Sequence, residues 1–256
     1  MAAPPDPSVL DRLAQGGAPA RAASMAALDA LYEGVTLAEL KRLSQAAMDG
    51  AEAAGADGVL HLGYGEVADA AMLKIVDTAS RALEAFGRPL RTVLDVGSGA
   101  GRPSVLAALA VPQLQRSVGV EVIPSLVDVS AAVATAYDEC YRSSVAAAPG
   151  AAPGGPEVAF RQGDAINGAD ADYSDFDLVV CNATLFPPPL ASRVYANAAQ
   201  SLTPGATLAI LSHAPPEDSD VRSKLADVAS LRLRMSWGHA DVHILQRRAS
   251  QESTTL

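Results

Sequence analysis

The stretch Arg91-Thr-Val-Leu-Asp-Val-Gly-Ser-Gly-Ala-Gly101 decides the fold of this chain of 256 residues. Residues 92–96 form a short, mostly apolar run that is typical of a buried strand, and three alternate glycines follow the run. Residues 103–110 have the composition of a helix. Strand, glycine turn and helix in this order predict the first unit of an open sheet in which strands alternate with helices.

The chain after this turn continues the alternation. Further strands are expected at residues 117–122, 157–165, 176–183 and 206–213, with helices at about 124–140, 190–202 and 217–228. Residues 230–237 and 240–248 alternate apolar and polar side chains around Gly238, which predicts an antiparallel hairpin. The expected fold class is therefore α/β: a doubly wound, seven-stranded, mostly parallel sheet with a terminal antiparallel hairpin.

The N-terminal third has a different character. Residues 1–23 are rich in Ala, Pro and Gly and poor in large apolar groups, which predicts a disordered tail, with an organellar targeting peptide as the alternative. Residues 24–88 predict a helical cap. It has two short helices over 24–54 with a break at Gly34, then the loop GVLHLGYGEV, then a helix over 72–86. The sheet domain is expected over residues 89–248, and a short tail over 249–256.

The composition limits the functions to consider. The chain has 19 Lys and Arg and 29 Asp and Glu, which give a net charge of −10. This charge argues against strong nonspecific binding to nucleic acid. No apolar run approaches the ~18 residues that span a bilayer, so a soluble, intracellular protein is expected. Cys140 and Cys181 are expected to be reduced and buried. His239 and His243 have no evident third partner, so no metal site is expected.

Acidic residues follow three successive predicted strands. Asp95 and Glu121 stand at the ends of the first and second strands, and Asp164 comes after the third. A ligand of such a sheet binds at the carboxyl ends of the strands, so we expect these side chains to meet there. The glycines within residues 97–101 let a ligand approach the backbone closely, and the following helix offers free N–H groups.

The glycine turn departs from two common motifs. A dinucleotide fingerprint requires GxGxxG, but Arg102 stands in place of the last glycine, and Ser98 is not part of a GxSxG nucleophile elbow. A carboxylate beside the turn suits a ligand with an ammonium or sulfonium group, because opposite charges attract strongly in a partly dry cleft. S-adenosylmethionine carries both groups. Glu121 is placed to accept ribose hydroxyls, and Asp164 to accept the adenine amino group.

Together these residues resemble the class I S-adenosylmethionine-dependent methyltransferases over about residues 91–248. A narrower resemblance rests on YGEV (64–67), LDVGSGAG, SVGVEV and DLVVCNATLF, which occur in the order found in the Dot-one (disruptor of telomeric silencing) histone-lysine methyltransferases. It implies that Tyr64 and Glu66 close over the methionine end of the cofactor and that Asn182 lies near the transferred methyl group. Phe186 is expected as an aromatic wall, although from spacing alone Asn182 and Phe186 fit ordinary structural roles equally well.

The candidate residues follow from these motifs. The candidate catalytic residues are Asn182, Tyr64 and Phe186, and the candidate cofactor-binding residues are Glu66, Asp95, Gly97, Ser98, Gly99, Gly101, Arg102, Glu121, Asp164 and Asn182. The resemblance is incomplete, because Ala183 and Thr184 replace the second asparagine and the aromatic residue of the Dot-one motif. The chain also lacks the basic segments with which nucleosome-modifying members grip DNA.

The resemblance implies methyl transfer to an amine, and the Dot-one motifs imply a lysine of a basic protein such as a histone. The alternatives are a small-molecule N- or O-methyltransferase and a cofactor-binding module without catalysis. Membrane and strong nucleic-acid binding are not expected, and nothing in the sequence fixes the oligomeric state. The location is expected to be nuclear for a histone-lysine enzyme and cytoplasmic otherwise.

Overall fold

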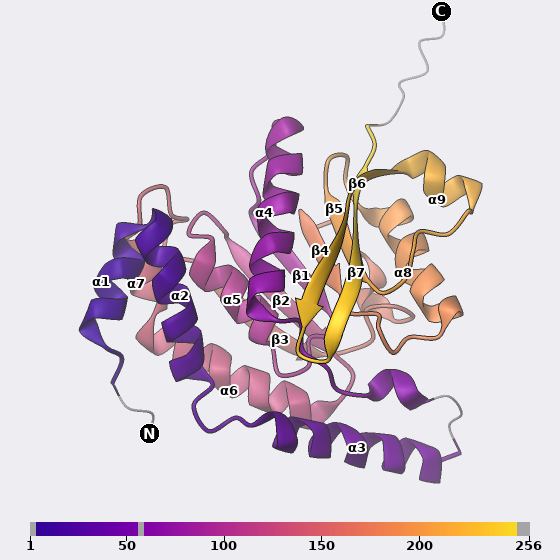
Figure 1. Cartoon of the computed structure of the whole chain (residues 1–256), viewed down its shortest axis with the longest axis horizontal. Coiled ribbons are helices and arrows are strands. Elements are labelled where there is room, and N and C mark those ends of the chain that lie inside the picture. Colours follow the sequence, from indigo (N-terminus) through magenta and orange to yellow (C-terminus); the bar gives the residue numbers. More distant parts are fainter. Residues whose placement is uncertain (1–3, 56–58, 250–256) are drawn as a thin grey trace, which may run out of the picture.

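The computed structural model describes residues 4–55 and 59–249, and its centre is a seven-stranded sheet in the order β3-β2-β1-β4-β5-β7-β6 (Figure 1). The strands are β1 (Thr92–Val96), β2 (Arg116–Glu121), β3 (Glu157–Gln162), β4 (Leu178–Cys181), β5 (Thr207–Leu211), β6 (Leu225–Met235) and β7 (Gly238–Arg247). Strands β1 to β5 pair in parallel, whereas β7 pairs antiparallel with both β5 and β6. The predicted fold class is confirmed, and the strand order reverses between β1 and β4.

Helices cover both faces of this sheet. They are α1 (Pro7–Gln15), α2 (Gly17–Leu31), α3 (Leu37–Ala53), α4 (Asp69–Ala85), α5 (Arg102–Ala110), α6 (Pro124–Cys140), α7 (Arg142–Ala146), α8 (Pro188–Ser201) and α9 (Ser219–Lys224), with the 3-10 helices η1 (Val59–Leu62) and η2 (Ala169–Ala171). Neighbouring β1 residues face opposite layers: Val93 joins the core with α4, α5 and α6, and Leu94 joins the core with α8. Among the described residues, no helix combines the length and apolar character needed to cross a membrane.

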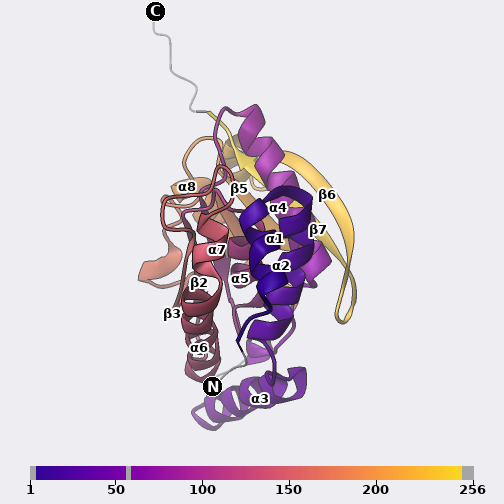
Figure 2. The same ribbon diagram turned by 90° about the vertical axis from the view of Figure 1, so that its left-hand side faces the viewer.

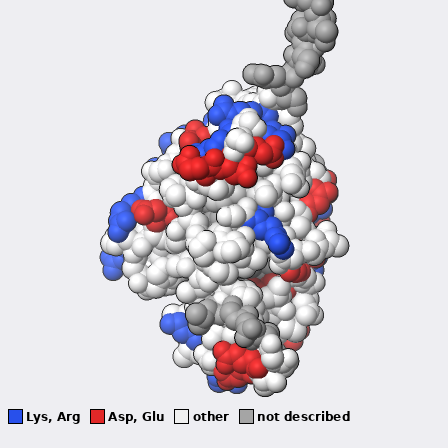
Figure 3. Space-filling view, turned by 90° about the vertical axis from the view of Figure 1, so that its right-hand side faces the viewer, with Lys and Arg blue, Asp and Glu red and all other residues white. Residues whose placement is uncertain are grey.

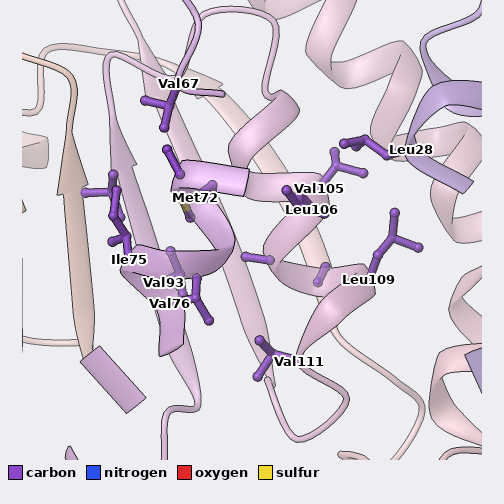
Figure 4. Packing of buried hydrophobic residues seen from close by; sticks show 14 of the residues in the cluster. Leu28, Val67, Met72, Ile75, Val76, Val93, Val105, Leu106, Leu109 and Val111 are labelled. Atoms are coloured by element: carbon purple, nitrogen blue, oxygen red, sulfur yellow. The ribbon is translucent and has the colours of Figure 1, made fainter. Parts of the chain in front are cut away.

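The packing of α4 explains why the cap is joined firmly to the sheet. Met72, Ile75 and Val76 recur at helical spacing and are almost completely buried. Figure 4 shows them in one layer with Val93 of β1 and with the buried side chains of α5. Full burial of each such side chain stabilises the fold by about 1.5–3 kcal/mol, so this apolar layer holds α4 in place.

The prediction of a disordered tail over residues 1–23 is wrong for the described residues 4–23. The helix α1 and the first part of α2 lie in that segment. Val9 and Leu13 supply the large buried groups of α1. Alanines such as Ala23 and Ala27 let α2 approach its neighbours closely (Figure 2), and Ser24 Oγ donates a hydrogen bond of 2.9 Å to Leu109 O of α5. Alanine favours helix strongly, which a criterion based on large apolar residues overlooks.

Other predicted elements differ in their limits. The helix expected at about 217–228 ends at Lys224, and β6 begins at the next residue, so the terminal hairpin is longer than predicted. The predicted break near Gly34 is confirmed, because α2 ends before it and α3 begins after it. Residues 250–256 of the predicted C-terminal tail lie outside the described residues.

The helix α3 crosses beneath the carboxyl ends of the parallel strands (Figure 1).

Asp177 joins the starts of β1 and β4. Its carboxylate accepts hydrogen bonds from Arg91 N at 2.8 Å and Thr92 N at 3.0 Å, and it forms an ion pair of 2.6 Å with Arg88. The Asp177 side chain is 9 % exposed, so these partners replace water almost completely. Because Arg88 lies between α4 and β1, this carboxylate fixes the junction between cap and sheet.

We predict that Asp177→Ala lowers the free energy of unfolding by about 2–4 kcal/mol, because two backbone N–H groups lose their acceptor and Arg88 loses its charged partner. Chemical denaturation measures the change. The matched control is Asp175→Ala, two residues earlier, whose side chain is 80 % exposed and lies 3.9 Å from Arg116. Its expected effect is within about 0.5 kcal/mol. Equal losses in the two variants would contradict this role of Asp177.

Candidate active site

A pocket lies at the carboxyl ends of β1, β2 and β4, beside the point at which the strand order reverses. It is lined by the loop before α4, the glycine turn after β1, and the segments that follow β2, β3 and β4. Ten of the candidate residues line it: Tyr64, Glu66, Asp95, Gly97, Ser98, Gly99, Glu121, Asp164, Asn182 and Phe186. Gly101 and Arg102 are not among the lining residues.

The glycine turn is shaped by its contacts with β2 and with the loop before α4. The N–H groups of Gly97 and Ser98 both donate to Val120 O, at 2.9 and 3.1 Å. Gly97 has φ +72°, and a Cβ added there would meet no atom within 4 Å, so its pocket side is open for a ligand. Gly99 has φ +55°, and a Cβ there would lie 2.8 Å from the Tyr64 ring, so only glycine allows that ring to approach.

Two buried carboxylates lie beneath this turn. Asp95 is 4 % exposed, and Ser104 Oγ donates to it at 3.0 Å. Burial raises the pKa of Asp95 to about 7 against the opposing effect of that hydrogen bond, and the nearby Glu121 charge adds to the rise. Glu121 accepts Gly99 N and Ile123 N, each at 2.9 Å, and its pKa is raised by burial in spite of these bonds. A cationic ligand would stabilise the charged form of both carboxylates.

Asp164 has a different environment from the two buried acids. It accepts Ile166 N at 2.8 Å and Asn167 N at 2.9 Å, and Asn167 Nδ2 donates to its second oxygen at 3.0 Å. Partial burial raises the pKa of Asp164, but these hydrogen bonds outweigh it and hold the pKa below its ordinary value. The carboxylate is therefore charged and fixed in orientation at the pocket wall.

Residues 63–67, which we call the lid, lie against the glycine turn, β4 and the β6–β7 hairpin. The Tyr64 hydroxyl donates to Glu66 Oε1 at 2.6 Å, and Asn182 Nδ2 donates to Gly65 O at 2.9 Å. Ser236 Oγ lies 3.3 Å from Glu66 O, and the Trp237 ring packs so closely on Gly65 that an added Cβ would lie 3.2 Å from it. The glycine turn, the end of β4 and the β6–β7 hairpin thus each contact the lid.

Asn182 lies both in the pocket lining and at the ordered end of β4. It lines the pocket, and its Oδ1 accepts Thr184 Oγ1 at 2.8 Å, so it also orders the end of β4. Thr184 Oγ1 in turn pairs with Ser212 Oγ at 2.9 Å, and Ser212 has φ +68°, a conformation that is uncommon outside glycine. Phe186 lines the pocket and also packs against the core beside α8.

The two candidates outside the pocket have other contacts. A Cβ at Gly101 would collide with the Phe160 ring at 2.3 Å, so this glycine makes room for packing rather than for a ligand. The Arg102 guanidinium forms ion pairs with Asp69 and Asp29 of the cap. Sequence reasoning missed these pairs and the Trp237 contact, because each joins segments far apart in the chain.

Among the described residues, no group of three or more His, Cys, Asp or Glu is arranged to hold a metal ion.

S-adenosylmethionine fits the residues that form this pocket. The open side of Gly97 leaves room for a ligand against the backbone, and Ser98 Oγ is buried without a hydrogen-bond partner among the described residues. The raised pKa values of Asp95 and Glu121 mark buried acids that a cation would stabilise in their charged form. A donor with ammonium, sulfonium, hydroxyl and amino groups matches this set of acceptors.

Comparison with solved structures finds several methyltransferases among the chains similar to this one. The rRNA methyltransferase AviRa from Streptomyces viridochromogenes superposes with a TM-score of 0.50 at 18 % identity, covering 72 % of this chain and 86 % of that chain. The N-methyltransferase NodS from Bradyrhizobium japonicum gives a TM-score of 0.46 at 14 % identity, covering 70 % of this chain and 97 % of that chain. Identities this low bear on the fold alone. No curated protein matches the chain.

A family model described as a methyltransferase domain matches residues 89–249. The match is to the general family and gives no support to the narrower Dot-one assignment. It runs from the residues before β1 to the end of β7, and so includes every strand of the sheet and the whole glycine turn. On this evidence, the chain belongs to the methyltransferase-domain family and binds S-adenosylmethionine as its methyl donor.

Proposed function

We propose that this protein transfers the methyl group of S-adenosylmethionine to the nitrogen of a small amine that binds as a cation. The observation that carries the proposal is the charge of the pocket. Among the described residues that line it are four carboxylates, Glu66, Asp95, Glu121 and Asp164, and no Lys or Arg. Such a pocket attracts cations and raises their local concentration.

Three of the four carboxylates are assigned to the cofactor. Glu121, oriented by Gly99 N and Ile123 N, is placed to accept ribose hydroxyls, and the fixed Asp164 suits the adenine amino group. Asp95, together with the open side of Gly97, suits the amino-acid part. The bound cofactor supplies a methyl group that its positively charged sulfur already activates. What remains for the protein is alignment of the acceptor and exclusion of water.

The fourth carboxylate is available for the acceptor. Glu66 lies on the lid, paired with the Tyr64 hydroxyl, and both residues line the pocket. The Glu66 carboxylate attracts the ammonium form of an amine, and the rings of Tyr64 and Phe186 exclude water near the reacting nitrogen. Methyl transfer needs the neutral amine, because only that form has a free electron pair, so the bound ammonium first gives its proton to water or to the Glu66 carboxylate. Removal of water favours the neutral form by lowering the pKa of the amine, against the opposing effect of the Glu66 charge.

A small amine is favoured over a protein lysine by the closure of the lid. The bond from Asn182 Nδ2 to Gly65 O joins the lid directly to the end of β4, where a lysine channel would have to open. Figure 3 shows the face formed by α8, α9 and the end of α3, where acidic and basic groups lie together toward α9 and the broad middle carries few charges. This face offers neither an extended acidic surface for a histone nor a basic one for nucleic acid.

The proposal is tested by transfer of a labelled methyl group from S-adenosylmethionine to four acceptor sets: small amines, their hydroxyl counterparts, free histones and nucleosomes. We expect label in the small amines. Label confined to histones or nucleosomes would replace the small amine by a protein lysine, and label confined to the hydroxyl compounds would overturn amine transfer. Failure of the wild-type protein to bind the cofactor would contradict the whole assignment.

We predict that Glu66→Gln lowers kcat/KM for the amine by about tenfold, because it removes the negative charge while keeping an oxygen for the Tyr64 hydroxyl. The Kd of the cofactor should change by less than about twofold, since the other three carboxylates remain. Steady-state kinetics and calorimetry measure the two quantities. The control is Glu52→Gln at the exposed end of α3, which should change neither.

We predict that Gly97→Ala weakens cofactor binding by about tenfold or more, because the methyl group occupies the open side of the turn. Gly87→Ala is the matched control, with a similar φ of +78°, no atom within 4 Å of an added Cβ, and a place outside this pocket. Both variants should lose about 1 kcal/mol of stability through backbone strain. Only Gly97→Ala should lose affinity, and equal affinity in the two variants would show that the ligand lies elsewhere.

We predict that cofactor affinity rises about tenfold from pH 6 to pH 8, because Asp95, with a pKa of about 7 in the free protein, must lose its proton to bind a cation. The free protein should lose stability as the pH rises from 3.8 toward 7, since the folded state binds this proton more tightly than the unfolded state. Calorimetry across this range measures the affinity. A pH dependence that persists in Asp95→Asn would assign it to another group.

A further inference from the structure

Arg102 occupies an electrostatically unfavourable place for a cation. It is the first residue of α5, where the positive end of the helix dipole disfavours positive charge. Two acids of the cap compensate for this. Nε and Nη2 donate to the two oxygens of Asp69 at 2.9 and 2.8 Å, and Nη2 also donates to Asp29 at 2.7 Å. The side chains of Arg102 and Asp69 are only 17 % and 18 % exposed, so the pair is well shielded from water.

The pair connects the glycine turn with the end of the lid. Asp69 is the first residue of α4 and follows the lid after a single residue, Ala68. Arg102 directly follows Gly101 of the turn. The guanidinium also lies 5.3 Å from the centre of the Tyr32 ring, and the Tyr32 hydroxyl donates to Ala100 O of the turn at 2.8 Å. Three residues of the cap, Asp29, Tyr32 and Asp69, thus converge on Arg102 and the glycine turn.

The fold of the cap does not depend on this pair. The apolar layer of Met72, Ile75 and Val76 fixes the body of α4, and Ser24 joins α2 to α5. The bidentate bond to Asp69 adds a direct tie between the first residue of α4 and the glycine turn, next to Val67 and Met72, which are buried in the core. Among the described residues, Asn182 and Ser236 each donate one hydrogen bond to a carbonyl of the lid.

We propose that Arg102 is a positioning residue that holds the lid closed over the bound cofactor by fixing the start of α4 against the glycine turn. This rests on the proposed function, in which Tyr64 and Glu66 of the lid line the part of the pocket where the acceptor meets the cofactor. Loss of the pair lets the start of α4 move away from the turn, and the lid with it. The cofactor and its product then dissociate faster, while the body of the cap remains folded.

The test measures the dissociation rate of S-adenosylhomocysteine, the demethylated cofactor, from Arg102→Met, Arg102→Lys and Asp69→Asn. We expect the rate to rise about tenfold in Arg102→Met and less in Arg102→Lys, which keeps the charge but loses the bidentate geometry. Hydrogen exchange of the lid amides should accelerate in the same order. If Arg102→Met does not fold, Asp69→Asn removes the charge of the partner and gives the same readouts.

The chain offers a matched control in Arg21→Met. Arg21 of α2 also forms a bidentate pair with an aspartate of α4, but its partner, Asp77, lies eight residues after Asp69. This variant should leave the dissociation rate and lid exchange unchanged, even if its melting temperature falls. A wild-type dissociation rate in both Arg102→Met and Asp69→Asn, or an equal increase in Arg21→Met, would overturn the proposal.

The outcome for Arg102 is distinguishable from that for the proposed function. If Glu66→Gln leaves amine methylation unchanged while Arg102→Met still speeds dissociation, the proposed acceptor is wrong and the role of Arg102 stands. If the Glu66 variant behaves as expected but lid exchange in Arg102→Met equals that of the wild type, the role of Arg102 is overturned.

Discussion

Three backbone N–H groups bind the glycine turn to the end of β2, and the site is built around these bonds. Gly97 and Ser98 donate to Val120 O, and Gly99 donates to the Glu121 carboxylate. The first two bonds keep the turn close to the sheet at the point where the strand order reverses. The third fixes the side chain that faces the ligand. Because Gly97 and Gly99 have no side chains, a ligand has access to the backbone at Gly97 while the Tyr64 ring packs on Gly99.

The same arrangement has a cost in stability. Asp95 and Glu121 are buried close enough to repel each other, and burial raises the pKa of both. Apolar side chains at these positions would avoid the cost of burying two like charges. The two acids therefore lower the stability of the protein without its ligand. A bound cation reverses the balance, because it replaces repulsion by attraction in a poorly solvated place. We therefore expect the cofactor to stabilise the protein against unfolding.

The sequence predicted what local patterns encode. Apolar runs followed by glycine or an acid located the strands, and the order of these acids placed Asp95, Glu121 and Asp164 at one edge, where they line one pocket. The helices at residues 7–23 were missed because α1 buries only two large side chains, Val9 and Leu13, and the first part of α2 packs through small alanines. The pairing of Arg102 with Asp69 has no local signal, since 33 residues separate the partners. Contacts of this kind depend on how the cap and the sheet dock, which periodicity does not describe.

The hairpin tip gives the molecule a property that its chemistry does not require. Trp237 is the single tryptophan of the chain, it is 39 % exposed, and its ring rests on Gly65 of the lid. Indole emission depends on local polarity and contact, so any displacement of this loop alters the only strong intrinsic fluorophore present. Trp237 emission is therefore an optical reporter of the position of the lid in the unlabelled protein, in real time and without a substrate.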